Sequence, residues 1–306
     1  MSPSTILMTG GGRGLGRAAA EHLLTTQPDR HLLLLARDGD RLVRELRETT
    51  GSANLSAITC DLASFADIRA AAEEIGRRLD AGEIPPLRDF LGNAGLQMAT
   101  TTSTTADGFE TTFGVNVLAN HLLLRLLLDR FAAPSRLVVV GSDVHFGDFR
   151  HNLGLVPAPV WAPVEELVKP GTATTATAGR RAYATSKLAV LYLVHALARR
   201  LPDGVDVYTY NPGVVAGTGL VRDAGPVTRR VAGAVLQALR VTPLAMGPAA
   251  AGRLLADTVT GPRPGPSGSY IDRGRVVPSS AESYDEAREE EVWRVVERIT
   301  TNTAPL

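Results

Sequence analysis

Residues 5–17 read Thr5-Ile6-Leu7-Met8-Thr9-Gly10-Gly11-Gly12-Arg13-Gly14-Leu15-Gly16-Arg17. A short apolar run leads into a turn whose glycines have the spacing G-x-x-x-G-x-G, and a helical pattern follows. Glycine adopts backbone angles that other residues avoid and lets the chain approach a ligand closely. The free N–H groups and positive dipole end of the following helix favour a phosphate. The stretch predicts a β-α-β unit that binds a dinucleotide through Gly10, Gly14, Leu15 and Gly16. Taken alone, the spacing is also compatible with a glycine-rich surface turn.

Beyond this turn, short apolar runs continue to alternate with longer helical patterns. Some runs, such as residues 32–35 and 137–140, are wholly apolar, as expected for strands buried on both faces of a parallel sheet. The alternation predicts the α/β class, with a Rossmann-type doubly wound parallel sheet of about seven strands and helices on both faces. The expected strands are residues 5–9, 31–36, 54–59, 89–92, 136–141, 205–210 and 269–271, and the expected helices are residues 14–25, 40–49, 65–79, 108–131 and 181–201.

Two stretches interrupt this rhythm. Residues 144–180 are proline-rich and end in a Thr/Ala run, so they predict a long insertion with at most a short helix near 164–168. Residues 213–260 look helical but lie between two late strands, and we interpret them as a substrate-loop region. No linker divides the chain, so a single domain is expected over residues 1–306. Both stretches follow strand ends, where α/β folds bind ligands, and their Val, Leu, Ala and Pro content favours an apolar substrate.

Composition excludes several classes of partner. Lys+Arg and Asp+Glu are equal at 32 each, without a long block of one sign, which gives no reason to expect a nucleic acid. The chain has one cysteine, Cys60, so no internal disulfide is possible. It has no basic leader and no run of ~20 apolar residues. We therefore expect a cytoplasmic protein without a membrane span, and no metal site, since Cys and His are not clustered.

The end of the second expected strand indicates which dinucleotide binds. NAD sites present a carboxylate there, whereas NADP sites need positive charge for the 2′-phosphate. Here the strand ends in Arg37, and Arg13 lies in the glycine turn. Two guanidiniums near one phosphate favour NADP(H) as the cofactor. The alternatives are that Arg37 is a solvated strand end, and that Asp38, which follows it, selects NAD.

Tyr183 and Lys187 are four residues apart in a helical segment and so share one of its faces. A phenol with a pKa near ~10 is a poor acid–base catalyst at neutral pH. A neighbouring ammonium stabilises the phenolate, so Lys187 is expected to lower the pKa of Tyr183. Lys187 is one of only two lysines in this arginine-rich chain. An isolated Tyr-x-x-x-Lys pattern is in most proteins an ordinary pair on a helix surface. Here it follows the glycine turn and the other motifs along the chain, so we interpret it as catalytic.

With these residues in place, the chain resembles the short-chain dehydrogenase/reductase family over about residues 5–220. The resemblance implies that Ser142 hydrogen-bonds a substrate carbonyl and that Asn116 anchors a water in the proton relay to Lys187. It also implies a set of cofactor contacts beyond the glycine turn, which includes Tyr183 and Lys187. The ordered motifs that carry the resemblance are Thr9-Gly10-x-x-x-Gly14-x-Gly16, Asp61-Leu62, Asn93-Ala94-Gly95, Asn116, Ser142, Tyr183-x-x-x-Lys187 and Asn211-Pro212-Gly213.

The implied cofactor contacts fall into three groups. Asp61 and Leu62 are expected to bracket the adenine, and Asn93-Ala94-Gly95 to pack against the ribose region. Pro212 and Gly213 are expected beside the nicotinamide, together with Val215 and Thr218. Family members often carry Thr at the position of Gly217, so the carboxamide contact here is Thr218 or is absent.

The histidines and the length of the insertion give two further expectations, one for the substrate site and one for the branch of the family. His145 is expected either to line the substrate site or to lie on the surface, whereas His121 and His195 are expected to be structural. The long gap between Ser142 and Tyr183 resembles the branch of retinol dehydrogenases and light-dependent protochlorophyllide reductases. So do residues 114–124 and 292–296.

These inferences predict an NADP(H)-dependent oxidoreductase that reduces a ketone or aldehyde of an apolar small molecule, with Tyr183 as proton donor. The alternatives are reduction of a carbon–carbon double bond on the same scaffold, a nucleotide-sugar epimerase or dehydratase, and a non-catalytic NADP(H)-binding protein. A homo-oligomer is possible through residues 108–131 and 181–201, unless the insertion blocks one of these helices.

Overall fold

A computed structural model describes residues 3–152, 154–215 and 245–301. Among these residues, eight strands form one sheet in the order β10-β9-β6-β5-β4-β1-β2-β3. Neighbouring strands are parallel except β9 and β10. The predicted α/β fold is confirmed, and every predicted strand is found, with β10 in addition. The strands are β1 (Ser4–Thr9), β2 (Arg30–Ala36), β3 (Leu55–Thr59), β4 (Leu87–Gly92), β5 (Ser135–Val140), β6 (Val205–Asn211), β9 (Tyr270–Asp272) and β10 (Arg275–Val277).

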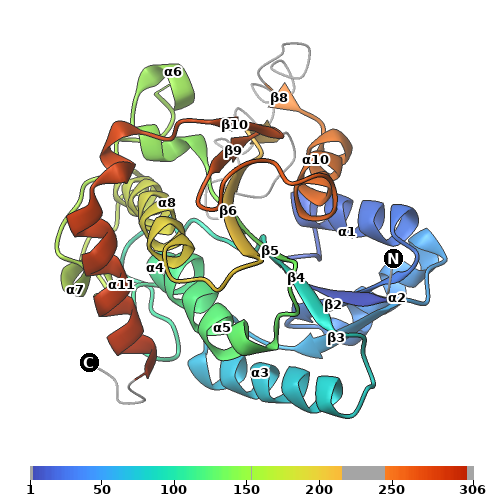
Figure 1. The fold of residues 1–306 in the computed structure, drawn as a ribbon. Helices are drawn as coiled ribbons and strands as arrows, with labels where there is room; N and C mark the ends of the chain where they lie inside the picture. Colours follow the sequence, from blue (N-terminus) through green and yellow to red (C-terminus); the bar gives the residue numbers. More distant parts are fainter. Residues whose placement is uncertain (1–2, 153, 216–244, 302–306) are drawn as a thin grey trace.

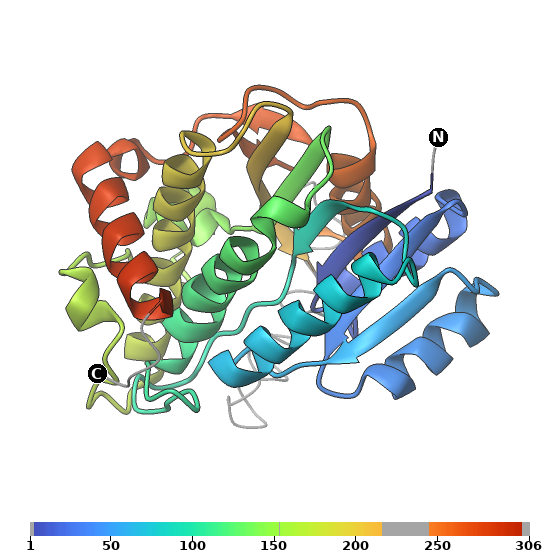
Figure 2. The same ribbon diagram turned by 60° about the horizontal axis from the view of Figure 1, so that its bottom comes forward.

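Helices cover both faces of this sheet (Figures 1 and 2). One face carries α1 (Gly14–Thr26), α2 (Gly39–Thr50) and α10 (Pro248–Thr260). The other face carries α3 (Phe65–Asp80), α5 (Ala119–Leu127) and α8 (Ala176–Ala198). A short parallel pair, β7 (Val214–Val215) with β8 (Ala245–Met246), lies outside the main sheet.

The apolar strands are buried on both faces, as their sequence predicts. In β2, Leu33 and Leu35 pack into the core beneath α3 and α5, whereas Leu32 and Leu34 pack into the core beneath α1. Successive side chains of a strand point to opposite faces, so a continuous apolar run fills both cores at once. The central strands are thereby fixed, and their carboxyl ends form a rigid edge on which a site can be built.

The helix expected over residues 108–131 is not uniform. It begins as α4 (Thr111–Phe113), passes through one π-helical turn at Gly114–Leu118, and continues as α5. Such turns shift the hydrogen-bond pattern by one residue and often occur at functional sites. The segment Thr111–Arg130 is apolar and long enough to cross a membrane, but 83% of its most apolar window is buried inside the fold. Here it serves as a core helix.

The insertion after β5 contains short helices, α6 (Phe149–Asn152) and α7 (Val164–Leu167), and α7 matches the short helix expected there. Helix α8 begins at Ala176, within the Thr/Ala run that the sequence analysis assigns to the insertion. Thr175 explains the earlier start, because its hydroxyl accepts a hydrogen bond from the Ala178 N–H and caps the helix. Local capping therefore extends α8 beyond its apolar pattern.

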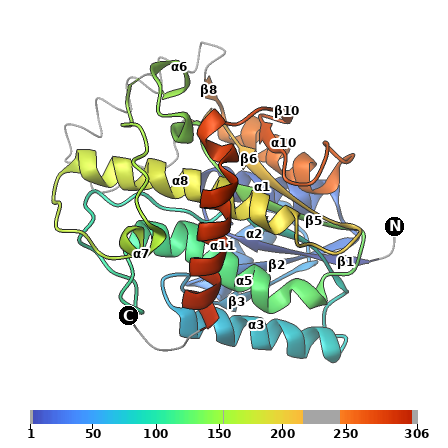
Figure 3. The ribbon, with the colours of Figure 1, turned by 60° about the vertical axis from the view of Figure 1, so that its left-hand side comes forward.

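The C-terminal helix α11 (Glu286–Thr301) packs across α8 and α5 and also contacts α7 (Figure 3). Its apolar stripe, which includes Val292 and Val296, is buried against them. Trp293 adds an edge-to-face contact with His121, at 5.2 Å between ring centroids. Two subunits could pair through this face of α5 and α8 only by displacing α11.

Candidate active site

The glycine turn joins β1 to α1 at the carboxyl edge of the sheet. Gly10 and Gly14 have positive φ angles of 72° and 53°. A Cβ on Gly16 would lie 2.1 Å from the Gly10 carbonyl oxygen, and a Cβ on Gly10 would lie 2.8 Å from the backbone of Ala94. Only glycine fits these positions. The turn is therefore a tight backbone cradle at a helix N-terminus, as a pyrophosphate requires.

The residues that follow β4 brace this cradle. The Asn93 side-chain amide donates to the Gly10 carbonyl oxygen at 2.9 Å, and the Ala94 N–H donates to the Thr9 hydroxyl at 3.0 Å. A Cβ on Gly95 would lie 3.4 Å from Lys187 Nζ, so this glycine lets the lysine approach the strand end. The segment 93–95 thus joins the glycine turn to the predicted catalytic residues.

Two arginines, one in the glycine turn and one at the end of β2, have exposed side chains. Arg13 and Arg37 are exposed, and within the described part of the chain neither forms an ion pair or a side-chain hydrogen bond. Asp38, which could have argued for NAD, instead caps α2 by accepting a hydrogen bond from the Arg41 N–H at 3.3 Å. The charge available to a ligand at the end of β2 is therefore positive, which fits a 2′-phosphate.

The predicted adenine contacts lie at the end of β3. The Asp61 carboxylate accepts a hydrogen bond from the Ala63 N–H at 3.0 Å, which shapes the turn leading into α3. Leu62 is partly buried against the core. Both side chains therefore already have a structural role, and their contact with adenine stays a prediction.

The predicted nicotinamide contacts follow β6. Gly213 has a φ of 66°, and its N–H donates to the Asn211 side chain at 3.1 Å. Pro212 is half-buried, and Val215 is buried in β7. Thr218 lies outside the described residues, as does much of the predicted substrate-loop region.

Tyr183 lies on α8 with 6% of its surface exposed, and its phenol is hydrogen-bonded to the Ser142 hydroxyl. Ser142 lies two residues after the end of β5 and caps a short 3-10 turn, η3 (Asp143–Phe146). Burial raises the pKa of Tyr183 to about 12, and the hydrogen bond from Ser142 acts in the opposite direction. The expectation that the pKa of Tyr183 is lowered is wrong, because burial raises it. At neutral pH the phenol therefore keeps its proton.

Lys187 is buried one helical turn further along α8. Its ammonium donates to the Val140 carbonyl oxygen at 2.7 Å and lies 5.7 Å from the centroid of the Tyr183 ring. Burial lowers the pKa of Lys187 to about 8. The ammonium thus sits between the end of β5 and the phenol, within reach of a ligand at the strand edge.

Asn116 lies in the π-helical turn, and its side chain is fully used by protein partners. Its Oδ1 accepts from the Leu96 N–H at 2.9 Å, and its Nδ2 donates to the Leu96 carbonyl oxygen and to the Ser186 hydroxyl. Its main-chain carbonyl accepts from the Asn120 side chain at 2.9 Å. The relay water expected at Asn116 stays a prediction. The sequence analysis did not identify Ser186 as a partner of Asn116.

The histidines are all engaged. His145 is 1% exposed and makes two hydrogen bonds, so the surface role considered for it is wrong. His195 lies 3.0 Å from the Ser283 carbonyl oxygen and also contacts Glu289. His121 contacts the Thr300 hydroxyl at 3.0 Å. The structural role predicted for His121 and His195 agrees with these contacts.

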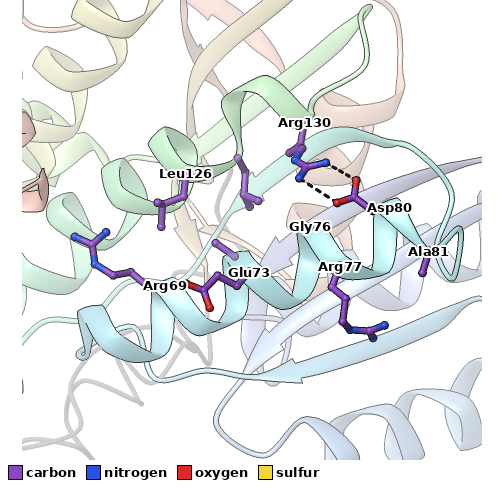
Figure 4. A pocket seen from close by; sticks show the side chains of 10 residues that line it. Arg69, Glu73, Gly76, Arg77, Asp80, Ala81, Leu126 and Arg130 are labelled. Carbon is purple, nitrogen blue, oxygen red and sulfur yellow. Dashed lines mark hydrogen bonds and ion pairs between the residues drawn. The ribbon is translucent and has the colours of Figure 1, made fainter.

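A surface groove of about 750 Å³ lies elsewhere, between α3 and the end of α5 (Figure 4). It borders the turns that precede β4 and β5, hence the amino edge of the sheet, opposite the glycine turn. Its charges are largely paired, since Arg130 binds Asp80 at 2.6 Å and Arg77 binds Glu83 at 2.6 Å. Ligands of doubly wound sheets bind at the carboxyl edge, so we place the candidate site there and not in this groove.

Solved structures share this architecture. A blue fluorescent protein from a metagenomic library, solved in complex with NADPH, superposes with a TM-score of 0.62. The match covers 88% of this chain and 95% of the other at 22% sequence identity. The likeness confirms the Rossmann-type fold.

Sequence comparisons identify the family. The family model for short chain dehydrogenases matches residues 4–151. Human retinol dehydrogenase 13 is 30% identical over 98% of this chain and 86% of its own length. Human retinol dehydrogenase 11 is 34% identical over 69% of this chain and 60% of its length. The Streptomyces sp. (strain C5) protein named "Putative daunorubicin C-13 ketoreductase DnrU" is 35% identical over 69% of this chain and 66% of its length.

The matches to retinol dehydrogenase 11 and to the Streptomyces protein thus span less than two thirds of those relatives. The match to retinol dehydrogenase 13 extends along nearly the whole chain. Together with the family model and the shared fold, these relatives confirm the predicted resemblance and its retinol dehydrogenase-like branch. The chain belongs to the short-chain dehydrogenase/reductase family.

Proposed function

We propose that this protein is an NADP(H)-dependent oxidoreductase that reduces a ketone or aldehyde of an apolar small molecule. The observation that carries the proposal is the buried, protonated phenol of Tyr183, hydrogen-bonded to Ser142 and flanked by Lys187. The phenol holds its proton at neutral pH, and the Lys187 ammonium beside it stabilises the phenolate that forms when the proton is given up. The glycine cradle lies at the same edge of the sheet, so cofactor and proton donor can meet at one substrate.

The chain's own residues then have separate roles. Ser142 and Tyr183 hydrogen-bond the carbonyl oxygen and polarise it, and Tyr183 gives its proton to that oxygen as the alcohol forms. Lys187 holds positive charge beside the phenolate left behind, and a water at Asn116 returns the proton. NADPH, when bound, supplies the hydride that the carbonyl carbon accepts. The protein contributes orientation and electrostatics.

Arg13 and Arg37 support NADP(H) as the cofactor, together with the solved neighbour that binds NADPH. A relative named as a ketoreductase supports a carbonyl substrate. A screen of apolar ketones and aldehydes with NADPH tests the proposal: the alcohol must appear as NADPH is consumed. Saturation of a carbon–carbon double bond would favour the alternative reaction, and binding without turnover would favour a non-catalytic role. The single domain over residues 1–306, the cytoplasmic location and the homo-oligomer stay predictions.

Arg37→Asp is expected to abolish the preference for NADPH over NADH. The wild-type chain should bind NADPH at least about tenfold more tightly than NADH, or about 1.4 kcal/mol, and the variant should lose this preference. The reason is that the variant removes an unpaired cation and adds a charge that repels the 2′-phosphate. Titration with each nucleotide, followed by nicotinamide fluorescence, measures the effect. Arg44→Asp, an exposed site on α2, is the control. An unchanged preference in Arg37→Asp would contradict the assignment.

The pH dependence of carbonyl reduction is expected to report Lys187. Its lowered pKa means that the ammonium loses its proton near pH 8 instead of above 10. The site needs the charged form, so kcat/KM should fall as the pH rises through about 8. Lys187→Arg stays charged over this range, so its profile should lack that alkaline limb, at lower overall activity. An identical limb in both enzymes would assign it to another group.

A further inference from the structure

His145 lies three residues after Ser142, in the short turn η3, and is shielded from solvent. Its Nδ1 lies 2.7 Å from the Ser142 carbonyl oxygen, and its Nε2 accepts a hydrogen bond from the Ser280 N–H at 3.2 Å. A backbone N–H can only donate, so Nε2 carries no proton. The neutral ring therefore bears its proton on Nδ1 and donates it to Ser142. Both ring nitrogens are used, and the tautomer is fixed.

The turn itself holds Ser142 only loosely. The Val144 N–H reaches the Ser142 hydroxyl at 3.5 Å, and the His145 N–H reaches the Ser142 carbonyl oxygen at 3.4 Å. Both distances are at the long limit for a hydrogen bond. The 2.7 Å contact from the imidazole is much the shortest of those made to Ser142 by this turn. The orientation of Ser142 therefore depends on where the ring of His145 is held.

The ring is held by late parts of the chain. It packs edge-to-face against Tyr270 of β9 at 5.1 Å between centroids, and Tyr270 donates to Asp143, the residue after Ser142. Ser280, which anchors Nε2, opens the short 3-10 turn η4 (Ala281–Tyr284). The turn η4 also contacts α8, because the Ser283 carbonyl oxygen of η4 lies 3.0 Å from Nδ1 of His195 on α8.

These contacts form a connected path between the two predicted catalytic hydroxyls. Tyr183 and His195 lie on the same helix, α8. From His195 the path runs through η4 and Ser280 to His145, and from there to Ser142. Side chains outside the reacting groups thus connect Ser142 to the helix that carries Tyr183, and His145 is the member that contacts Ser142.

We propose that His145 is a positioning residue of the active site, which fixes Ser142 relative to Tyr183 through the Ser142 carbonyl and is itself fixed by Ser280. This inference rests on the proposed function, in which Ser142 polarises the substrate. Displacement of a catalytic group by about 1 Å can cost on the order of 100-fold in rate.

Two substitutions of His145 distinguish the two hydrogen bonds that its ring makes, one with Ser142 and one with Ser280. His145→Asn keeps a donor near Nδ1 but loses the acceptor, and His145→Gln does the reverse. We expect His145→Gln to lower kcat for carbonyl reduction by about tenfold or more, because the contact with Ser142 is lost. His145→Asn keeps that contact but loses the anchor at Ser280, so it should lower kcat less, by about three- to fivefold. The dissociation constant for NADPH should be unchanged in both.

A cycle with Ser142→Ala distinguishes positioning from a purely structural role. If His145 acts through Ser142, His145→Gln should cost less than about twofold further once the Ser142 hydroxyl is gone. His121→Gln is the matched control, since His121 is a buried histidine that contacts Thr300 and has no place in the path to Ser142. Its effect on kcat/KM should be equal in both backgrounds, although it lowers the melting temperature.

Ser280→Pro gives a second route if His145→Gln does not fold. The φ of Ser280 is −60°, which suits proline, so this variant removes mainly the N–H that anchors His145. It should lower kcat and show the same dependence on Ser142. An equal loss from either variant with and without the Ser142 hydroxyl would overturn the inference. Full activity of Ser142→Ala alone would instead contradict the proposed function.

Discussion

Tyr183→Phe is expected to lower kcat for carbonyl reduction by about 1,000-fold while the protein stays folded. General acid catalysis by one positioned side chain contributes typically about 100- to 10,000-fold. The phenol carries a proton at neutral pH and lies beside Ser142 and Lys187, so it is the group placed to deliver a proton here. Phenylalanine keeps the ring and its packing and removes the proton. The measurement is NADPH consumption with a reactive ketone, followed by absorbance.

Two control measurements test whether the loss of activity in Tyr183→Phe comes from weaker NADPH binding or from a loss of stability. The dissociation constant of NADPH for Tyr183→Phe should stay within about threefold of wild type, because the glycine cradle and Lys187 remain. Tyr208→Phe is the matched control. Tyr208 is fully buried on β6, and its hydroxyl donates to the Gly265 carbonyl oxygen at 2.8 Å, away from the site. It should cost about 1 kcal/mol of stability and little activity. More than a tenth of wild-type activity in Tyr183→Phe would remove Tyr183 as the proton donor.

Gly16→Ala should abolish nucleotide binding. The added Cβ would lie 2.1 Å from the Gly10 carbonyl oxygen and 2.3 Å from Asn93 Nδ2. Relief requires the turn to open, and that movement breaks the cradle that the phosphates need. We expect a loss of about 2–3 kcal/mol in the free energy of unfolding. The dissociation constant for NADPH should rise by more than about 100-fold, as measured by fluorescence titration.

Gly12→Ala is the control within the same turn. A Cβ on Gly12 meets nothing within 4 Å, and its φ is not positive. This variant should therefore bind NADPH within about threefold of wild type and melt at the same temperature or slightly higher. If both variants bind equally well, the glycine turn is not the phosphate site.

Much of the fold could be predicted from the sequence because its strands are nearly pure apolar runs. Two late elements were missed for different physical reasons. Strand β10 is short and largely exposed, so it carries neither a continuous apolar run nor a clear alternation. Helix α11 does carry a helical stripe, Val292-Val295-Val296-Ile299, but its charged residues and its place after the last predicted strand hid it.

In the candidate site, features that depend on local motifs could be predicted, whereas features that depend on distant residues could not. Tyr183, Lys187 and Ser142 are found from motif spacing alone. The protonation state of Tyr183 is not, because it depends on burial by the whole fold. The roles of Ser280 and His195 are also invisible, since no local pattern links residues 135 positions apart. Asn116 could be predicted as a site residue, but its hydrogen-bond partners could not be predicted, because they lie on a loop and a helix distant in the sequence.

The contact between His145 and Ser280 also has a consequence for biosynthesis. The two residues are 135 positions apart, and at about 5–20 residues per second the ribosome needs on the order of ten seconds to add the second after the first. In the later part of that interval the nascent chain contains the glycine turn, Ser142, Tyr183 and Lys187, but not Ser280, which anchors His145. The predicted catalytic residues are therefore all synthesised before Ser280, and the contact that anchors His145 is one of the last of the site to form.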